Sequence, residues 1–194
     1  MRHFVYFSST AQTSGKALSK KDLMKAGRID IAIHTIINSF FISNKLRDDV
    51  VLHLIFYGMP DPPKHIELHI KPETELSKKD IGTLLKKILY KYQEGRKNEV
   101  HPGCFVEKKS FLNVIEELRD EDREIFILDE GGEELREVKI PEGSVFVLGD
   151  QNGLPKKELK RLKKNCKVVS VGPEIYFASQ VVTIINNELD LRKI

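Results

Sequence analysis

The chain has 194 residues and a mass of 22.3 kDa, which is long enough for one substantial domain. Hydrophobic residues make up 40% and charged residues 31%, and this composition excludes a disordered, collagen-like or disulfide-stabilised protein. No apolar stretch approaches the roughly 18 residues of a membrane span, and the first residues lack the apolar core of a signal peptide. Cys104 and Cys166 lie far apart, as in proteins of a reducing compartment. We therefore expect a soluble cytoplasmic protein with no membrane partner.

Charge is distributed unevenly along the chain, although the net charge is only +3. Residues 116–137 contain 11 acidic residues and three arginines, which gives a net charge of −8. Residues 156–167 contain seven basic residues and one acid, and residues 1–28 contain six basic residues and one acid. Basic segments of this density indicate a polyanionic partner such as a nucleic acid.

Strand-like and helix-like segments alternate in the first half of the chain. Residues 29–42 have apolar side chains at helical spacing, and the proline-rich segment 59–63 separates two apolar strands. The expected elements are a strand at 3–8, a helix at 29–42, strands at 49–58 and 65–71, a helix from Ser77 to about 93, a strand at 104–107, and a helix from Ser110 to about 119. Ser77 and Ser110 are the predicted caps of their helices.

The second half repeats a tighter cycle of strand and helix. The expected elements are strands at 125–128, 145–148 and 168–171, a helix from Pro155 to 165, and a last helix from 173 or 174 to about 189. This alternation predicts an α/β fold in which helices flank a mostly parallel sheet. We expect residues 1–194 to form a single domain with an inserted hairpin near 49–71.

Three glycine-containing loops follow predicted strands, at 128–132, 148–155 and 171–174. Ligands of parallel α/β sheets bind beyond the carboxyl ends of the strands, and glycine lets a ligand approach the backbone closely. Each loop alone could be an ordinary turn, but three in series favour a ligand site. None of them has the spacing of a dinucleotide or triphosphate loop.

The same loops carry a family resemblance. Residues 146–155 read FVLGDQNGLP and residues 171–180 read VGPEIYFASQ, and together they resemble the cofactor region of SPOUT-class RNA methyltransferases. The segments GRID at 27–30, GMPDPPK at 58–64 and IINNELD at 184–190, with Asn38, resemble the archaeal TrmY branch of that class. This branch methylates N1 of pseudouridine at position 54, in the T-loop of tRNA.

The resemblance implies a homodimer with a trefoil knot in its C-terminal half, which binds S-adenosyl-L-methionine between knotted loops. Apolar side chains and backbone amides in such loops suit an adenosyl group. The residues to which the resemblance assigns cofactor binding are Leu128, Gly149, Asp150, Asn152, Gly153, Val171, Gly172, Tyr176, Phe177 and Ala178.

Methyl transfer to N1 requires that this nitrogen is held in line with the donor and loses its proton. We predict Asp61 and Arg28 as the catalytic residues at the substrate. Asp61 lies between two prolines that restrict its backbone, but it could equally be a turn aspartate bonded to its own loop. Arg28 can bind a phosphate or a base carbonyl as a planar fork, with a surface ion pair to Asp30 or Asp22 as the alternative.

Two further residues are candidates for substrate contact, and each has a structural alternative. Asp30 could serve only as a helix cap. Ser179 could face the target base, or its hydroxyl could bond to the backbone of its own helix.

The predicted helix 155–165 has a basic face. At 100° per residue its lysines and arginine fall in one arc, while Leu159 and Leu162 lie on the opposite side. Contacts from lysine to phosphate position an RNA without reading its sequence, whereas a solvated surface is the alternative. The residues that we expect to contact tRNA are Lys156, Lys157, Lys160 and Lys164. The acidic segment 116–137 is expected to face away from the RNA.

No metal site is expected. His65, Glu67 and His69 share one face of a predicted strand, but four residues at ~3.3 Å each place the two histidines roughly 13 Å apart. One ion cannot bridge that distance.

Three functions compete on these grounds. The first is a tRNA pseudouridine N1-methyltransferase that uses S-adenosyl-L-methionine. The second is a related SPOUT enzyme that acts on ribosomal RNA. The third is an RNA-binding protein without catalytic activity.

Overall fold

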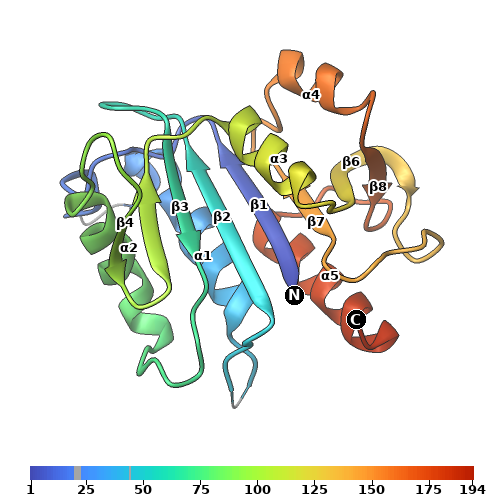
Figure 1. The fold of residues 1–194 in the computed structure, drawn as a ribbon, viewed down its shortest axis with the longest axis horizontal. Coiled ribbons are helices and arrows are strands. Elements are labelled where there is room, and N and C mark those ends of the chain that lie inside the picture. The colour runs from blue at the N-terminus through green and yellow to red at the C-terminus, as the bar shows by residue number, and fades with distance from the viewer. Residues whose placement is uncertain (20–22, 44) are drawn as a thin grey trace.

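Eight strands form one mixed sheet in the described part of the chain, which comprises residues 1–19, 23–43 and 45–194 of a computed structural model (Figure 1). Their order across the sheet is β4-β5-β3-β2-β1-β7-β6-β8. The strands are β1 (Arg2–Ser8), β2 (Val50–Phe56), β3 (Lys64–Leu68), β4 (Asn98–His101), β5 (Cys104–Glu107), β6 (Ile125–Glu134), β7 (Val145–Leu148) and β8 (Lys167–Ser170).

The sheet has a parallel half and an antiparallel half. β1 is parallel to β2 and β7, and β6 is parallel to β7 and β8. The pairs β2–β3, β3–β5 and β4–β5 are antiparallel. The predicted α/β class with a mostly parallel sheet is therefore confirmed, and the carboxyl ends of β1, β2, β6, β7 and β8 share one edge. β2 and β3 form the antiparallel hairpin expected near 49–71, and β2 lies in the middle of the sheet.

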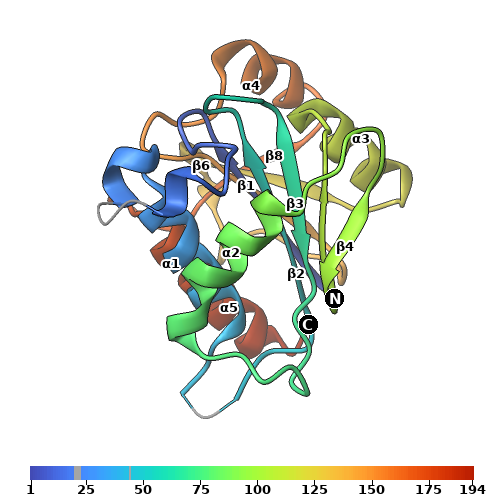
Figure 2. The ribbon, with the colours of Figure 1, turned by 90° about the vertical axis from the view of Figure 1, so that its left-hand side faces the viewer.

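Helices cover both faces of this sheet (Figures 1 and 2). The α-helices are α1 (Ile29–Phe40), α2 (Ile81–Tyr90), α3 (Phe111–Asp120), α4 (Lys156–Leu162) and α5 (Ala178–Arg192), and the short 3-10 helices are η1 (Ala17–Ser19), η2 (Leu23–Ala26) and η3 (Lys78–Asp80). α1, α2 and α5 pack on one face, and α3 and α4 pack on the other. The predicted cap of α3 is confirmed, because Ser110 Oγ accepts a hydrogen bond from Asn113 N at 3.3 Å.

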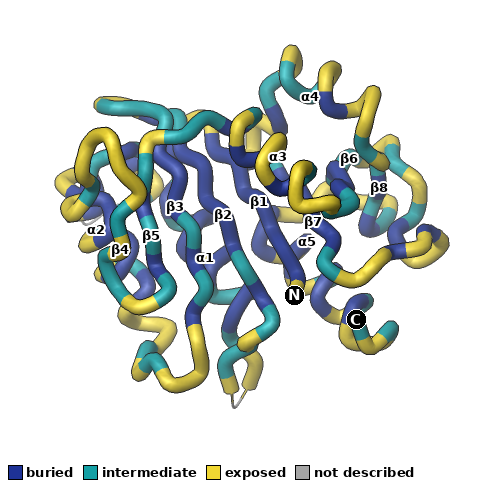
Figure 3. Tube along the Cα trace, in the orientation of Figure 1, coloured by how far each residue is buried: buried dark blue, intermediate teal, exposed yellow. Residues whose placement is uncertain are grey.

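Alternation of side chains along the central strands separates two cores. Phe4 and Tyr6 of β1 face α1 and α5, whereas Val5 and Phe7 face α3. All four side chains are almost completely buried, as Figure 3 shows along the whole of β1. A strand with apolar residues on both faces is typical of the middle of an α/β sheet.

Polar side chains join α5 to α1 and to the start of β1. Asn38 Nδ2 of α1 donates to Ser179 O of α5 at 3.0 Å, and Asn186 Nδ2 donates back to Asn38 O at 3.4 Å. Arg2 is buried and donates to Asn186 Oδ1 at 3.2 Å and pairs with Asp190 at 2.7 Å. α5 is thereby held at both ends against the sheet. None of the described helices has the length and apolar character that crossing a bilayer requires.

Several predicted boundaries are wrong. The strand predicted at 125–128 continues to Glu134, so the predicted loop 128–132 lies within β6, whose pairing with β8 is irregular between Leu128 and Glu133. The last helix begins at Ala178 and not at 173 or 174, because Gln180 Oε1 accepts a hydrogen bond from Phe177 N at 3.0 Å and caps the helix there. The helix predicted at 155–165 ends at Leu162. The sequence also gives no prediction of β4, whose four residues have no clear apolar alternation.

Candidate functional site

A cavity of about 540 Å³ lies beyond the carboxyl ends of β7 and β8 and beside the irregular part of β6 that follows Leu128, where the three glycine-containing segments meet. This volume is in the range of small-molecule sites. Of the predicted cofactor residues, eight line the cavity: Leu128, Gly149, Asp150, Asn152, Gly153, Val171, Tyr176 and Ala178. Gly172 and Phe177 are not among the lining residues, and the Phe177 side chain is 58% exposed.

Ten lining residues are not among those predicted for the cofactor, although one of them, Lys156, is predicted for contact with tRNA. They are Asp129, Glu130, Leu148, Leu154, Lys156, Leu159, Ser170, Glu174, Ile175 and Val181. Most of them belong to the loops that the sequence singled out, so reading whole loops would have found them. Leu159 and Val181 come from α4 and α5, which follow the predicted loops directly, but the sequence does not show which faces of these helices turn toward the cavity.

The loop after β7 forms a tight wall of the cavity. A Cβ atom on Gly149 would lie 2.5 Å from the backbone carbon of Gly153 and 2.8 Å from Leu154 N, so no side chain fits there. Hydrogen bonds to Asp150 close the turn, from Gly153 N to its carbonyl at 2.8 Å and from Asn152 N to its Oδ1 at 2.8 Å. The glycine therefore allows the backbone to fold onto itself beside the ligand space.

Asp150 joins this loop to the loop after β1. Its Oδ2 atom accepts hydrogen bonds from Ser8 Oγ (3.0 Å), Ser9 N (2.7 Å) and Ser9 Oγ (3.0 Å). The residue is 8% exposed, so few of these bonds can be replaced by water. The carboxylate thus holds the cavity wall in place from the neighbouring strand.

Replacing Asp150 by asparagine is expected to lower the melting temperature. The amide nitrogen of asparagine cannot accept the hydrogen bonds from Ser8 and Ser9, and buried donors left without acceptors cost about 1–3 kcal/mol. For a chain of this size that corresponds to a decrease of roughly 2–12 °C. Calorimetry measures it, with Asp120→Asn on an exposed residue of α3 as the control. Equal melting temperatures of the two variants would contradict the structural role.

The irregular part of β6, between Leu128 and Glu133, is tied to the end of α4 by an ion pair. Lys163 Nζ lies 2.9 Å from Asp129 Oδ2, and Asp129 Oδ1 accepts from Gly131 N at 3.1 Å. The hydrogen bond from Lys163 holds the pKa of Asp129 below its usual value. α4 also contributes Lys156 and Leu159 to the cavity lining, so this helix borders the cavity.

The basic face of α4 is partly neutralised by acids. Arg161 pairs with Glu116 at 2.9 Å, and Lys163 pairs with Asp129. Two residues of the acidic segment 116–137 therefore pair with α4 and with the residue that follows it, and the expectation that this segment faces away from the RNA stays a prediction. Lys156, Lys157, Lys160 and Lys164 have no ion-pair partner within the described residues.

Arg28 lies at the start of α1 in the left-handed conformation, with φ 61°. Its guanidinium binds Asp30 through two hydrogen bonds, Nε to Oδ1 at 3.1 Å and Nη2 to Oδ2 at 3.0 Å. The hydrogen bond to Asp30 raises the pKa of Arg28. The ion pair considered as the alternative is thus present, and Asp30 does not cap the helix. Asp22, the other possible partner, lies outside the described residues, as do Lys20 and Lys21.

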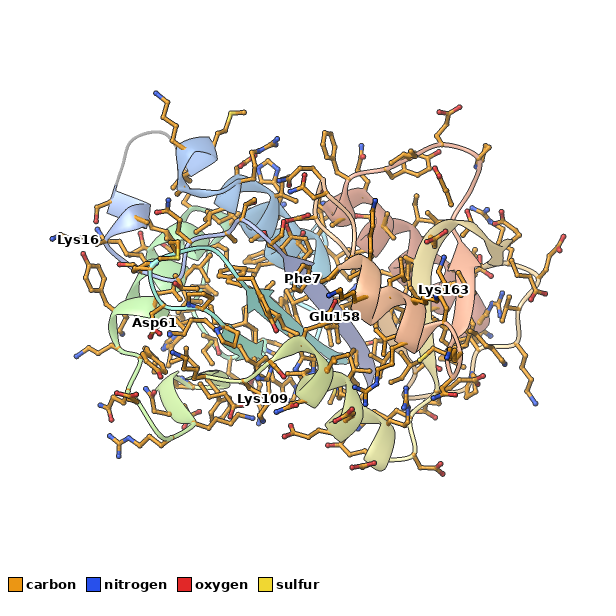
Figure 4. The ribbon with its side chains drawn as sticks, turned by 90° about the horizontal axis from the view of Figure 1, so that it is seen from above. Phe7, Lys16, Asp61, Lys109, Glu158 and Lys163 are labelled. Atoms are coloured by element: carbon orange, nitrogen blue, oxygen red, sulfur yellow. The ribbon has the colours of Figure 1, made fainter. Side chains whose placement is uncertain are left out.

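Asp61 lies in the loop after β2. Its carboxylate accepts hydrogen bonds from Lys108 and from Lys64, the latter at 2.6 Å, and these bonds lower its pKa. Figure 4 shows Asp61 and Lys163, the residue after α4, on opposite sides of Phe7, and Asp61 does not line the cavity. One chain therefore does not bring Asp61 to the cavity.

Ser179 is nearly buried in the first turn of α5, and its carbonyl accepts from Asn38 and from Thr183. Ser179, Arg28 and Asp30 are not among the cavity-lining residues. Their predicted contact with the substrate stays a prediction.

The histidines group differently from the prediction. β3 ends at Leu68, before His69, and strand pairing brings His53 of β2 beside His65 and Glu67. Donor atoms of His53, His65 and Glu67 lie within 4.8 Å of one another. Periodicity within one strand could not reveal this group, because it depends on the register between two strands.

Comparison with solved structures defines the class of the fold. The crystal structure of Archaeoglobus fulgidus Nep1 bound to S-adenosylhomocysteine matches with a TM-score of 0.62 and 16% identity, and the match covers 100% of this chain and 99% of that one. The sheet with its cavity beside β6, β7 and β8 thus has the SPOUT methyltransferase fold, as predicted. Whether the C-terminal half is knotted stays a prediction.

The sequence comparisons identify the family. A family model described as "Putative SAM-dependent RNA methyltransferase" matches residues 1–194, and the chain belongs to this family. A relative from Methanococcoides burtonii named tRNA (pseudouridine(54)-N(1))-methyltransferase is 34% identical over 98% of this chain and 96% of its own. A relative from Vibrio parahaemolyticus named "Putative pseudouridine methyltransferase" is 32% identical over 100% of both chains.

The cavity residues fit S-adenosylmethionine. Leu128 and Val171 are apolar wall residues of the kind that an adenine ring needs, and the absence of a side chain at Gly149 leaves room for close approach of the backbone. Glu130 and Glu174 line the same cavity and have no ion-pair partner among the described residues, so their charges are available to the cationic groups of the cofactor. The negative charges of the two glutamates attract a cationic ligand such as S-adenosylmethionine and repel a polyphosphate.

Proposed function

We propose that the chain methylates N1 of pseudouridine 54 in the T-loop of tRNA with S-adenosylmethionine as donor. The observation that carries this proposal is the full-length family match, which coincides with a cofactor-sized cavity at the predicted loops. The relative from Methanococcoides burtonii, which is named for this reaction, supports the choice of substrate.

The reaction sets two tasks for the residues of this chain. The bound cofactor supplies a methyl group on a sulfonium, which is strongly electrophilic. The irregular part of β6 and the loops after β7 and β8 hold the donor away from water, and residues at the cavity mouth hold the acceptor nitrogen in line. Pseudouridine N1 is itself the nucleophile once its proton leaves, so no covalent enzyme intermediate is needed.

The contacts of Arg28 and Asp61 favour positioning roles. Arg28 is fixed by Asp30 and keeps one side of its guanidinium for a phosphate or a base carbonyl. Asp61 is ionised and already accepts from Lys64 and Lys108, so it is a weak proton acceptor. We propose that both residues position the RNA. Arg28 contacts it directly, whereas Asp61 acts by fixing its own loop together with Lys64 and Lys108.

Replacing Asp61 by asparagine is expected to lower kcat by less than about 10-fold, whereas loss of a general base costs about 100- to 10,000-fold. Because its pKa lies below the ordinary value of 3.8, Asp61 stays ionised from pH 5 to 9 and contributes no limb to the pH profile. Rates measured across that range should therefore keep the wild-type profile. A lost acidic limb in the variant would identify Asp61 as the base.

The assembly is part of the proposal. We propose a homodimer with a C-terminal trefoil knot, located in the cytoplasm. Ile175 and Phe177, 84% and 58% exposed, lie at or beside the cavity, where a second copy would cover them. Light scattering on the eluting protein measures the mass, and a single-chain mass would contradict the dimer.

Two transcripts of the tRNA T-arm test the reaction. One carries pseudouridine at position 54 and the other carries uridine, and each is incubated with the protein and methyl-labelled S-adenosylmethionine. We expect methyl label only in the transcript with pseudouridine, because N1 of uridine carries the glycosidic bond. Label in the uridine transcript would contradict N1 chemistry, and no label in either would favour the non-catalytic RNA-binding protein.

A second candidate substrate follows from the relatives. The Vibrio parahaemolyticus relative is equally similar and its name specifies a pseudouridine but no tRNA. A ribosomal fragment that contains pseudouridine is therefore the matched competitor in the same assay. Label in this fragment and not in the T-arm would favour the enzyme that acts on ribosomal RNA.

A further inference from the structure

Asn152 carries a carboxamide at the rim of the cavity, in the turn that follows β7. Its Nδ2 atom donates to Ser9 Oγ at 3.1 Å, and its backbone nitrogen donates to Asp150 Oδ1 at 2.8 Å. The residue lines the cavity and is at the same time exposed to solvent. Asn152 is therefore accessible both to a ligand inside the cavity and to a molecule that approaches from outside.

The hydrogen bonds of Ser9 determine how this carboxamide is oriented. The carboxylate of Asp150 only accepts, so Ser9 donates its single hydroxyl proton to Asp150 Oδ2 at 3.0 Å. Ser9 Oγ must then accept from Asn152, and only the amide nitrogen of that side chain can donate. The carbonyl oxygen, Asn152 Oδ1, is thus directed away from Ser9, and no described residue donates a hydrogen bond to it.

The turn that carries Asn152 is held in place from below. Asp150 Oδ2 also accepts from Ser8 Oγ at 3.0 Å and from the backbone nitrogen of Ser9 at 2.7 Å, and Gly153 N donates to the Asp150 carbonyl at 2.8 Å. These bonds fix residues 150–153 to one another and to the loop after β1. Asn152 Oδ1 is therefore an oriented acceptor, which loses little conformational freedom when a donor binds to it.

Further hydrogen bonds connect this rim to the segment of Arg28. Gln151 Nε2 donates to Thr10 Oγ1 at 3.3 Å, and Thr10 Oγ1 donates to the carbonyl of Gly27 at 3.1 Å. Gly27 also packs closely on this loop, because a Cβ atom there would lie 1.7 Å from Thr10 O. The turn of Asn152 thus joins the cavity to the residue that is assigned above to RNA contact.

The two sides of the turn differ in their access to solvent. Leu148 and Leu154, which flank the turn, line the cavity and are only 2% and 8% exposed. Asn152 is exposed, as are its neighbours Ser9 and Thr10 in the loop after β1. The buried side suits the cofactor, whereas the open side, where Asn152 lies, is the side from which RNA must bring the base.

The base to be methylated has one donor that suits such an acceptor. A pseudouridine ring carries two N–H groups, at N1 and N3, on either side of the C2 carbonyl. N1 loses its proton in the reaction and must stay open to the methyl group, whereas N3 keeps its proton throughout. An acceptor that holds the ring at N3 therefore leaves N1 free to lie in line with the donor.

We propose that Asn152 Oδ1 accepts a hydrogen bond from N3–H of the pseudouridine that is methylated, and that this contact selects a uracil-type ring. The inference rests on the proposed function and adds to it a residue that touches the base. A cytosine-type ring has a lone pair at N3 where uracil has a proton, so it would place two acceptors against each other. Asn152 does not remove the N1 proton, because a carboxamide is not a base at neutral pH.

Two T-arm transcripts test this contact, one with pseudouridine and one with 3-methylpseudouridine at position 54, because the methyl group replaces the N3 proton. Fluorescence anisotropy measures their affinities with S-adenosylhomocysteine present, so the measurement needs no turnover. We expect wild type to bind the 3-methyl transcript about 10- to 100-fold more weakly, because the acceptor is left unpaired. In Asn152→Ala this discrimination should fall about 10-fold. Comparing the two proteins cancels any effect of the methyl group on the RNA itself.

Gln151→Ala is the matched control, because Gln151 is the other exposed amide of the same turn and is not among the cavity-lining residues. It should keep the wild-type discrimination between the two transcripts, whatever its effect on their common affinity. Equal discrimination in wild type and Asn152→Ala would overturn the proposal. An equal loss of discrimination in both variants would overturn it as well.

Calorimetric titration with S-adenosylmethionine distinguishes the base from the cofactor as the partner of Asn152. We expect Asn152→Ala to bind the cofactor within about twofold of wild type, as exposed substitutions without steric conflict do. A loss of about tenfold or more would assign Oδ1 to the cofactor and overturn the proposal.

The proposed function is tested separately, by methylation of the pseudouridine transcript. A wild-type protein that methylates this transcript but does not discriminate at N3 would refute the present inference alone. One that shows the expected discrimination in binding but transfers no methyl group would refute the proposed function and leave the contact at N3 supported.

Discussion

Replacing Gly149 by valine is expected to weaken S-adenosylmethionine binding by about 10- to 100-fold. A Cβ atom at this position would lie 2.5 Å from the backbone of Gly153, and backbone cannot rotate away as a side chain can. The loop after β7 must shift, and overpacking of this kind costs about 1–3 kcal/mol. Each 1.4 kcal/mol is about tenfold in affinity if the shift is absorbed at the cavity wall. Calorimetric titration with the cofactor measures the change.

Gly131→Ala is the matched control. Gly131 lies in the irregular part of β6, and the nearest atom to an added Cβ there would be Asp129 Oδ1 at 3.5 Å, an ordinary contact. We expect cofactor affinity within about twofold of wild type, since substitutions without steric conflict change stability by no more than about 0.5 kcal/mol. Equal losses in the two variants would show that the affinity does not depend on the wall at Gly149.

Replacing four lysines of α4 by glutamine is expected to weaken tRNA binding by about 100- to 1,000-fold at 0.1 M salt. These lysines have no acidic partner among the described residues, so they are free to neutralise phosphates. Each phosphate contact releases counterions and contributes roughly 0.7–0.9 to the slope of log K against log salt. The magnitude of the slope of log K against log salt concentration should therefore decrease by about 3. The substituted residues are Lys156, Lys157, Lys160 and Lys164.

The control variant removes four positive charges from a surface distant from α4. Four exposed lysines at and near α2, far from α4 in Figure 1, are replaced by glutamine in a second variant: Lys71, Lys78, Lys79 and Lys87. Net charge then changes equally in both proteins, and tRNA affinity should fall only through weak long-range attraction. If both variants lose the same affinity and slope, α4 is not the contact surface.

The sequence was sufficient for elements whose ends are marked by local chemistry. β5 and β7 have the predicted boundaries, because apolar strands there are bordered by glycine, serine or lysine. α5 begins later than predicted because the side chain of Gln180, which lies inside the helix, caps it at Phe177. β4 was not predicted, because this edge strand is defined by its pairing with β5 and not by its own apolar pattern.

Part of the candidate site was also predictable. Loops at the carboxyl ends of parallel strands converge for topological reasons, which is why eight of the ten predicted cofactor residues line one cavity. Leu159 and Val181 line it from helices whose placement depends on packing of the whole chain. Outside the cavity, the grouping of His53 with His65 and Glu67 was not predicted, since it depends on the register between β2 and β3, which no single segment encodes.

The ion pair between Lys163 and Asp129 has a thermodynamic consequence. Asp129 lines the cofactor cavity, and Lys163 follows the helix that we propose for RNA contact. If a phosphate of the RNA competes with Asp129 for this ammonium group, the two ligands become energetically coupled through one bond. By thermodynamic linkage, bound RNA then changes the affinity for S-adenosylmethionine by the same factor by which bound S-adenosylmethionine changes the affinity for RNA.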